Sequence, residues 1–169
     1  MYKQIAEVKL KSGQLMEIGV VITPDANYAN ELNQFLCHKP NHYRWHIKQC
    51  FEESLDQLET RFYIGKLDGK IVSNIMTTEA NGIGILGHVF TLSSQRRKGA
   101  CKAIMAHQME DFSHRKGRLL YLGTGYDSAP YWIYHHFGFR SIYPESGFMK
   151  YNVHPDYEKQ HFLLSKTLL

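Results

Sequence analysis

Two dipeptides, Asp68-Gly69 and Asn81-Gly82, divide the middle of the chain into three short runs of strand-forming residues. These runs cover residues 61–67, 70–78 and 83–92. Asp-Gly and Asn-Gly are favoured in two-residue hairpin turns, because both central positions of such a turn need positive φ angles. The spacing therefore predicts three consecutive antiparallel strands in the middle of the fold.

The third of these strands leads into a basic loop and then a helix. The loop runs from Gln95 to Cys101, and a helical pattern covers residues 100–112. The first turn of a helix leaves backbone N–H groups without partners, and its dipole end is partly positive. Gly99 lets a ligand approach the backbone, and the three preceding residues are cations. The junction predicts a site for a phosphate-bearing cofactor, although three consecutive cations alone would also fit a solvated turn.

The remaining segments indicate an α/β chain with one crossover. The helix after the basic loop ends at Gly117, and the strand that follows is expected to be parallel to its predecessor by the right-handed crossover rule. The first 14 residues are assigned no element. In chain order, the other expected elements are a strand at 15–23, helices at 30–37 and 43–59, a strand at 118–123, a helix at 129–137, and strands at 139–143 and 148–151.

Length, charge and cysteine content exclude several classes of protein. A chain of 169 residues fits one domain with a substantial core. The net charge of +4 favours anionic ligands, and the isolated basic cluster argues against nucleic acid. Cys37, Cys50 and Cys101 lack CxxC spacing, so no disulfide framework or cysteine-based zinc site is expected. The chain has neither a signal-peptide core nor a membrane-spanning apolar run, which predicts a cytoplasmic protein with no membrane partner.

Two further patterns suggest other functions, and their context argues against each. Residues 82–87 match the dinucleotide-binding pattern GxGxxG, but strand-forming residues follow where a helix is required. We interpret these glycines as turn and bulge positions. His38, His42 and His46 have the spacing of ligands on one helical face, but Pro40 interrupts them and no glutamate completes a protease motif. No metal site is expected.

The order of these features resembles the GNAT superfamily of acetyltransferases. A strand, an R-x-x-G-x loop, a long helix, a parallel strand and a short helix follow one another, and Tyr134 lies four residues before Gly138-Phe139. The resemblance implies an α/β fold with a mixed, largely antiparallel sheet, a splayed central pair of parallel strands and flanking helices. Residues 1–152 would form a single domain. Residues 153–169 would form a C-terminal extension that packs on the domain or on a second subunit, so a homodimer is one expected assembly.

The resemblance also implies a binding site for acetyl-CoA. The R-x-x-G-x-G/A loop of the family falls on Arg96, Gly99 and Cys101, so the backbone N–H groups of this loop are expected to hold the pyrophosphate. The backbone of the preceding strand end is expected to pair with pantetheine. The residues expected at the cofactor are Val89, Phe90, Thr91, Arg96, Arg97, Lys98, Gly99, Ala100, Cys101 and Asp127.

Two of these residues depart from the family pattern. Cys101 is larger than the expected glycine or alanine, so either the helix begins slightly away from the cofactor or the thiol forms part of a wall. Its thiol is expected near the phosphates and far from the thioester, which argues against an acyl-enzyme. Asp127 stands where the family often has an asparagine on the cofactor, and its charge leaves that contact open.

Tyr134 matches the tyrosine that is commonly proposed as the general acid of the family, and a structural role is the alternative. A phenol near the sulfur would protonate the departing thiolate. The attacking amine must also lose a proton, and His88 and Glu79 are the candidate bases. His135, His136 or a water relay are further alternatives.

The expected function is that of an N-acetyltransferase. The acetyl group would pass from acetyl-CoA to a primary amine, on a small molecule or a peptide, by direct attack in a ternary complex. Residues 28–59 and 140–151 are expected to form the acceptor pocket. The alternative from another class is a non-catalytic CoA-binding sensor or interaction module.

Overall fold

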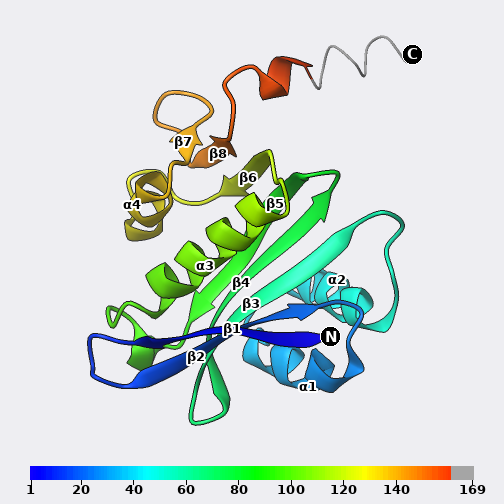
Figure 1. The fold of residues 1–169 in the computed structure, drawn as a ribbon, viewed down its shortest axis with the longest axis vertical. Coiled ribbons are helices and arrows are strands. Elements are labelled where there is room, and N and C mark those ends of the chain that lie inside the picture. The colour runs from blue at the N-terminus through cyan, green and yellow to red at the C-terminus, as the bar shows by residue number, and fades with distance from the viewer. Residues whose placement is uncertain (161–169) are drawn as a thin grey trace.

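The hairpin turns at Asp68-Gly69 and Asn81-Gly82 join three neighbouring strands of one eight-stranded sheet. This arrangement comes from a computed structural model of the chain, which describes residues 1–160 (Figure 1). The strands are β1 (Tyr2–Lys9), β2 (Leu15–Ile22), β3 (Glu59–Leu67), β4 (Lys70–Ala80), β5 (Ile83–Thr91), β6 (Leu119–Gly123), β7 (Arg140–Ser141) and β8 (Phe148–Asn152).

The sheet has the order β1-β2-β3-β4-β5-β6-β8-β7. Its neighbouring strands are antiparallel except for β5 and β6, which form one parallel pair. A parallel pair needs a crossover connection, and a long helix between β5 and β6 provides it. The mixed, largely antiparallel sheet confirms the fold class expected from the sequence.

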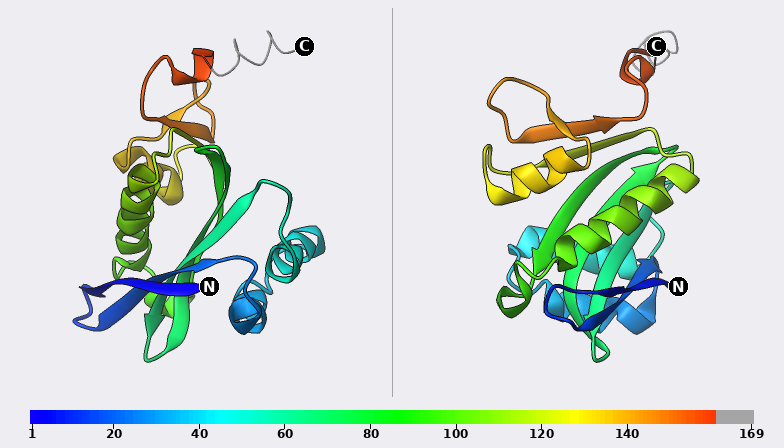
Figure 2. Two further views of the ribbon diagram at one scale, coloured as in Figure 1. Left: turned by 45° about the vertical axis from the view of Figure 1, so that its right-hand side comes forward. Right: turned by 60° about the vertical axis from the view of Figure 1, so that its left-hand side comes forward.

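Helices cover both faces of the sheet (Figure 2). They are α1 (Ala26–Phe35), α2 (Asn41–Glu52), the short 3₁₀ helix η1 (Ser93–Gln95), α3 (Ala100–His114) and α4 (Ala129–His136). One core cluster contains side chains of α1 and α2, such as Leu32 and Phe51, together with Phe62 of the sheet. The other contains side chains of α3 and α4, such as Ile104 and Tyr134. The sheet therefore separates an α1/α2 side from an α3/α4 side.

The N-terminal half differs from the sequence-based expectation at three places. Strand β1 was not predicted, because it lies at the edge of the sheet and many of its side chains are exposed. Helix α1 begins at Ala26, four residues before the expected start, because the Asp25 carboxylate accepts a hydrogen bond of 2.9 Å from the Asn27 N–H. Helix α2 ends at Glu52, since Leu55 and Leu58 pair across a turn and do not continue the helix.

The start of the C-terminal extension contacts β6 and β8. The Glu158 carboxylate accepts a hydrogen bond of 2.9 Å from the Tyr121 hydroxyl and forms an ion pair with Lys150. Arg118 donates a hydrogen bond of 2.9 Å to the Tyr157 hydroxyl. The rest of the expected extension, residues 161–169, lies outside the described residues. None of the helices described is both long and apolar enough to cross a membrane.

Candidate functional site

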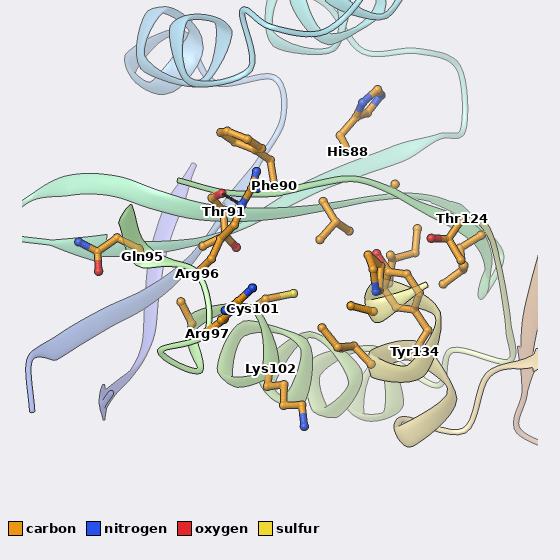
Figure 3. Close-up of a pocket in the computed structure, with 18 of the residues that line it drawn as sticks. His88, Phe90, Thr91, Gln95, Arg96, Arg97, Cys101, Lys102, Thr124 and Tyr134 are labelled. Atoms are coloured by element: carbon orange, nitrogen blue, oxygen red, sulfur yellow. Dashed lines mark hydrogen bonds between the residues drawn. The ribbon is translucent and has the colours of Figure 1, made fainter. Parts of the chain in front are cut away.

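The parallel strands β5 and β6 diverge shortly after they begin. Their pairing joins Ile83 to Leu119 and Ile85 to Tyr121, and it ends there, although β5 continues to Thr91. A cavity of about 730 Å³ opens where the strands separate. Its walls come from the second half of β5, the basic loop, the first turn of α3, the end of β6 and the start of α4 (Figure 3).

Most of the residues expected at the site line this cavity. They are His88, Val89, Phe90, Thr91, Arg96, Arg97, Gly99, Ala100, Cys101 and Tyr134. Lys98, Asp127 and Glu79 do not line it. The expected site is therefore brought together by the divergence of two strands, apart from these three residues.

A β-bulge in β5 shapes one wall of the cavity. Asn74 pairs with Phe90 and Met76 pairs with Gly87, so the bulged strand has one more residue than its partner between these pairs. His88 lies in the bulge with a φ of 47°, which is rare for a residue other than glycine. The buried Asn74 amide donates a hydrogen bond of 3.0 Å to the His88 carbonyl and holds this conformation. The part of β5 from Leu86 onward has no pairing with β6, so its backbone is available to an extended ligand.

The basic loop has the geometry of an anion site. Arg97 has a φ of 63° and Gly99 a φ of 95°, and α3 begins at the next residue. Within the described residues, the N–H groups of Arg97, Lys98 and Gly99 have no hydrogen-bond acceptor. Left-handed residues followed by a helix N-terminus point such N–H groups at a common ligand. These features fit a pyrophosphate.

The side chains of the loop are held around this backbone. The Arg96 Nε donates a hydrogen bond of 3.2 Å to the Thr91 carbonyl, which ties the loop to the end of β5. The Lys98 ammonium donates to Gln95 at 3.1 Å, and the Lys98 carbonyl accepts from the Lys11 N–H at 3.0 Å. A Cβ built on Gly99 would meet no atom within 4 Å, so the space beside this residue is open to a ligand.

Cys101 forms part of the cavity wall on the first turn of α3. Figure 3 shows its sulfur directed into the cavity toward Tyr134, whereas the sequence suggested a position near the phosphates. Burial raises the pKa of the Cys101 thiol to about 11, so the thiol is protonated at neutral pH. A protonated thiol is a poor nucleophile, so this environment does not favour an acyl-enzyme at Cys101.

Tyr134 lies on α4 with only 6% of its surface exposed. The helix that carries it begins at Ser128, whose hydroxyl accepts a hydrogen bond of 3.3 Å from the Tyr131 N–H. Burial, and to a smaller extent the neighbouring Cys101, raises the pKa of the Tyr134 phenol above its usual value. The hydroxyl is therefore a proton donor at neutral pH.

His88 projects from β5 on the α1/α2 side, opposite to Tyr134 (Figure 3). Its ring lies 5.1 Å from the Tyr43 ring of α2 in an edge-on arrangement. Burial lowers the pKa of His88 to about 4, and the positive charges of Lys39 and His46 act in the same direction. The imidazole is therefore neutral at physiological pH and has a free lone pair.

Glu79 and Asp127 are engaged elsewhere. The buried Glu79 carboxylate pairs with Arg115 at 2.6 Å and accepts a hydrogen bond of 2.7 Å from Thr77. Asp127 accepts a hydrogen bond of 2.8 Å from the Trp132 indole. Glu79 is thus positioned to hold the end of α3 on the sheet, and it does not line the cavity.

Several residues that shape or line the cavity were not indicated by the sequence, among them Asn74, Lys11, Lys39 and Lys102. An asparagine within an apolar strand is unusual and was the one available signal for Asn74. Nothing in the local sequence distinguishes Lys11 or Lys39 from surface lysines. The described residues contain no group of three or more histidine, cysteine or acidic side chains that could hold a metal ion.

Comparisons with known proteins relate this geometry to a family. The sequence matches the family model of an acetyltransferase (GNAT) domain over residues 28–160. No curated protein matches the chain.

Several solved structures are similar in fold. A GNAT-family acetyltransferase from Staphylococcus aureus Mu50 is 18% identical with a TM-score of 0.62, and the match covers 81% of this chain and 99% of that chain. The ribosomal-protein-S18-alanine N-acetyltransferase from Escherichia coli is 12% identical with a TM-score of 0.60, covering 79% and 94%. The PaiA N-acetyltransferase from Thermoplasma acidophilum, in complex with coenzyme A, is 10% identical with a TM-score of 0.53, covering 79% and 98%. At these identities the likeness shows the fold alone.

Proposed function

Because the chain belongs to the GNAT acetyltransferase domain family, we propose that it transfers an acetyl group from acetyl-CoA to a primary amine. The amine attacks directly while both substrates are bound. The observation that carries this proposal is that one cavity between β5 and β6 is lined by the anion-binding loop, Tyr134 and His88.

The loop end of the cavity fits the phosphates of CoA. The free N–H groups of the loop, the open space beside Gly99 and the cations Arg96 and Arg97 match a pyrophosphate in shape and charge. The unpaired stretch of β5 that includes Val89 and Thr91 offers backbone groups to the amides of pantetheine. This orientation directs the reactive end of the molecule away from the loop and toward α4.

His88 and Tyr134 have complementary protonation states for this reaction. When bound, acetyl-CoA supplies a thioester whose carbonyl carbon accepts the nucleophile and whose sulfur leaves. The neutral His88 accepts the proton that the incoming ammonium must lose and passes it to solvent. Tyr134 donates its hydroxyl proton to the departing sulfur and recovers one from the nitrogen. One proton is released overall.

The proposal is tested by measuring CoA-thiol release from acetyl-CoA with a panel of amines. Tyr134→Phe is expected to lower kcat by about 10²- to 10⁴-fold, the usual range for loss of a general acid. Tyr131→Phe is the matched control, because Tyr131 lies on the same helix and its buried hydroxyl bonds to Ser141 outside the cavity lining.

Acetyl-CoA affinity is expected to stay unchanged in both variants. Full activity of Tyr134→Phe would contradict the role of Tyr134 as the general acid, but it would leave the acetyltransferase proposal intact. Binding of CoA without turnover of any amine would contradict the enzymatic proposal and support a CoA-binding module.

A further inference from the structure

The cavity lining is strongly cationic. Among the described residues, its charged side chains are all lysines and arginines, with no aspartate or glutamate. These cations are Lys11, Lys39, Arg96, Arg97 and Lys102. A ligand that carries several positive charges would be repelled by such a wall, because like charges interact strongly where water is partly excluded.

Four of the five cations lie at the loop end of the cavity, where we place the phosphates of CoA. Arg96 and Arg97 lie in the basic loop, and Lys102 is on the first turn of α3. Lys11 is held beside the loop by the hydrogen bond of its N–H to the Lys98 carbonyl. The pyrophosphate and 3′-phosphate of CoA provide enough negative charge for this group.

Lys39 belongs to the other side of β5. It lies between α1 and α2, next to His38, whose ring is 4.0 Å from the Phe90 ring. Lys39 and His88 both line the cavity. The positive charge of Lys39 also lowers the pKa of both His38 and His88, after the larger effect of burial. Lys39 therefore faces the same space as the proposed proton acceptor.

No negative charge balances Lys39 in the part of the chain that the structure describes. No described carboxylate lies within 4.0 Å of its ammonium. The side chain is half-buried, and burial lowers the pKa of Lys39 from its usual value. Other positive charges act on the same two imidazoles, Arg96 on His38 and His46 on His88. A half-buried, unpaired ammonium beside a cavity is suited to an anionic partner.

On the basis of the proposed function, we propose that the acceptor is a small amine with a carboxylate adjacent to its amino group, and that Lys39 binds this carboxylate. An α-amino acid has this chemistry. Its carboxylate would pair with Lys39 while its amino group lies beside His88, since the two groups are attached to one carbon atom. The nitrogen forms the new bond to the acetyl carbon as the carbon–sulfur bond breaks, with the protons distributed as described above.

The experiment compares matched acceptors with the wild-type chain, Lys39→Met and Lys39→Arg. Each α-amino acid is paired with its carboxamide, and an aminoalkylphosphonate arm distinguishes a phosphonate from a carboxylate acceptor. Lys48→Met is the control, because Lys48 is exposed on α2, pairs only with Glu52 in the described structure and lies outside the cavity lining.

The wild type is expected to favour the amino acid over its amide in kcat/KM by roughly 10- to 100-fold, the effect of one charge-assisted hydrogen bond. Lys39→Met is expected to remove this preference while the KM for acetyl-CoA stays the same, and Lys39→Arg to keep most of it. In the presence of CoA, the amino acid and not the amide should raise the Tm of the wild type.

Four results would overturn the inference. Turnover of amines without preference for the carboxylate would overturn it while leaving the acetyltransferase proposal intact. A higher KM for acetyl-CoA in Lys39→Met, with the preference unchanged, would assign Lys39 to the CoA phosphates. A phosphonate preferred over the carboxylate would replace the proposed acceptor class. Absence of turnover with every amine, despite CoA binding, would overturn the proposed function and this inference together.

Discussion

The side-chain amide of Asn74 donates a hydrogen bond of 3.0 Å to the main-chain carbonyl of His88, across the β4–β5 ladder. Asn74 is fully buried, and His88 adopts a positive φ in the bulge that this bond supports. One buried amide therefore links the interior of β4 to the wall of the cavity. The bulge positions the His88 side chain and ends the regular course of β5 beside the proposed thioester site.

Replacement of Asn74 by alanine is expected to lower both stability and activity. Loss of the hydrogen bond leaves the His88 carbonyl without this donor and costs about 1–3 kcal/mol of unfolding free energy. The bulge loses its support, so the fold decrease in kcat is expected to exceed the fold decrease in acetyl-CoA affinity. Urea denaturation and steady-state kinetics measure the two effects.

Ser73→Ala is the matched control for Asn74. Ser73 is equally buried on β4, and its hydroxyl bonds to that of Thr91 at 2.7 Å, away from the bulge. The Ser73→Ala variant should lose stability, but its kcat should change less than that of Asn74→Ala. Equal kcat values for the two variants would contradict a special role of the Asn74 contact.

Replacement of Gly99 by alanine is expected to weaken CoA binding. Gly99 has a φ of 95°, so a side chain there costs roughly 1–2 kcal/mol of strain. Its Cβ would enter the open space that we assign to the pyrophosphate. We expect the Kd for CoA, measured by calorimetry, to rise by about tenfold or more, which corresponds to about 1.4 kcal/mol.

Gly69→Ala separates strain from ligand contact in this experiment. Gly69 has a φ of 75° in the β3–β4 turn, and a Cβ there also meets no atom within 4 Å. Both variants should lose similar stability, but only Gly99→Ala should lose affinity. Unchanged CoA affinity in Gly99→Ala would argue against the loop as the phosphate site.

Local sequence patterns were sufficient for the central sheet and the basic loop. The turns at Asp68-Gly69 and Asn81-Gly82 are confirmed, since a two-residue turn depends on its own residues. The helix after the loop and the parallel strand β6 are also confirmed. Strand β1 was missed because the edge of a sheet exposes many of its side chains and weakens the apolar alternation.

Contacts between distant segments could not be predicted in the same way. Lys39 lines the cavity because α1 and α2, which flank it in the chain, pack on the same side of the sheet as His88. Glu79 was considered a base because it lies at the end of a strand near His88 in sequence. Its side chain pairs with Arg115, 36 residues later, and no local pattern indicates this partner. Its proposed role as a base stays a prediction that mutation can test.

His88 is expected to make the stability of the protein depend on pH below neutrality. In the folded protein burial lowers its pKa to about 4, whereas the unfolded chain takes up the proton near a pKa of about 6.5. Between these values the unfolded chain binds more protons, so stability is present above about pH 6.5 and is lost as the pH falls toward 4. His88→Gln should flatten this part of the profile.

The measurement is the urea midpoint between pH 7 and pH 4 at constant ionic strength. The exposed His114 at the end of α3 is the control, and His114→Gln should retain the wild-type slope. An identical slope for His88→Gln and the wild type would show that His88 ionises normally, and would remove the argument that it is neutral in the site.

Replacement of Glu79 by glutamine distinguishes a structural carboxylate from a general base. Its carboxylate is 4% exposed and pairs with Arg115 at 2.6 Å, and Arg115 also binds Asp111 at 2.9 Å. Removal of one partner leaves the guanidinium partly buried with less compensation, so we expect a loss of about 3 kcal/mol of unfolding free energy. Glu110→Gln, which changes an exposed carboxylate on the same helix as Asp111, should cost no more than about 0.5 kcal/mol.

Below the unfolding temperature of each variant, the folded Glu79→Gln protein should keep a kcat close to that of the wild type and an unchanged pH–rate profile. A collapse of kcat in fully folded Glu79→Gln would instead identify this carboxylate as the base.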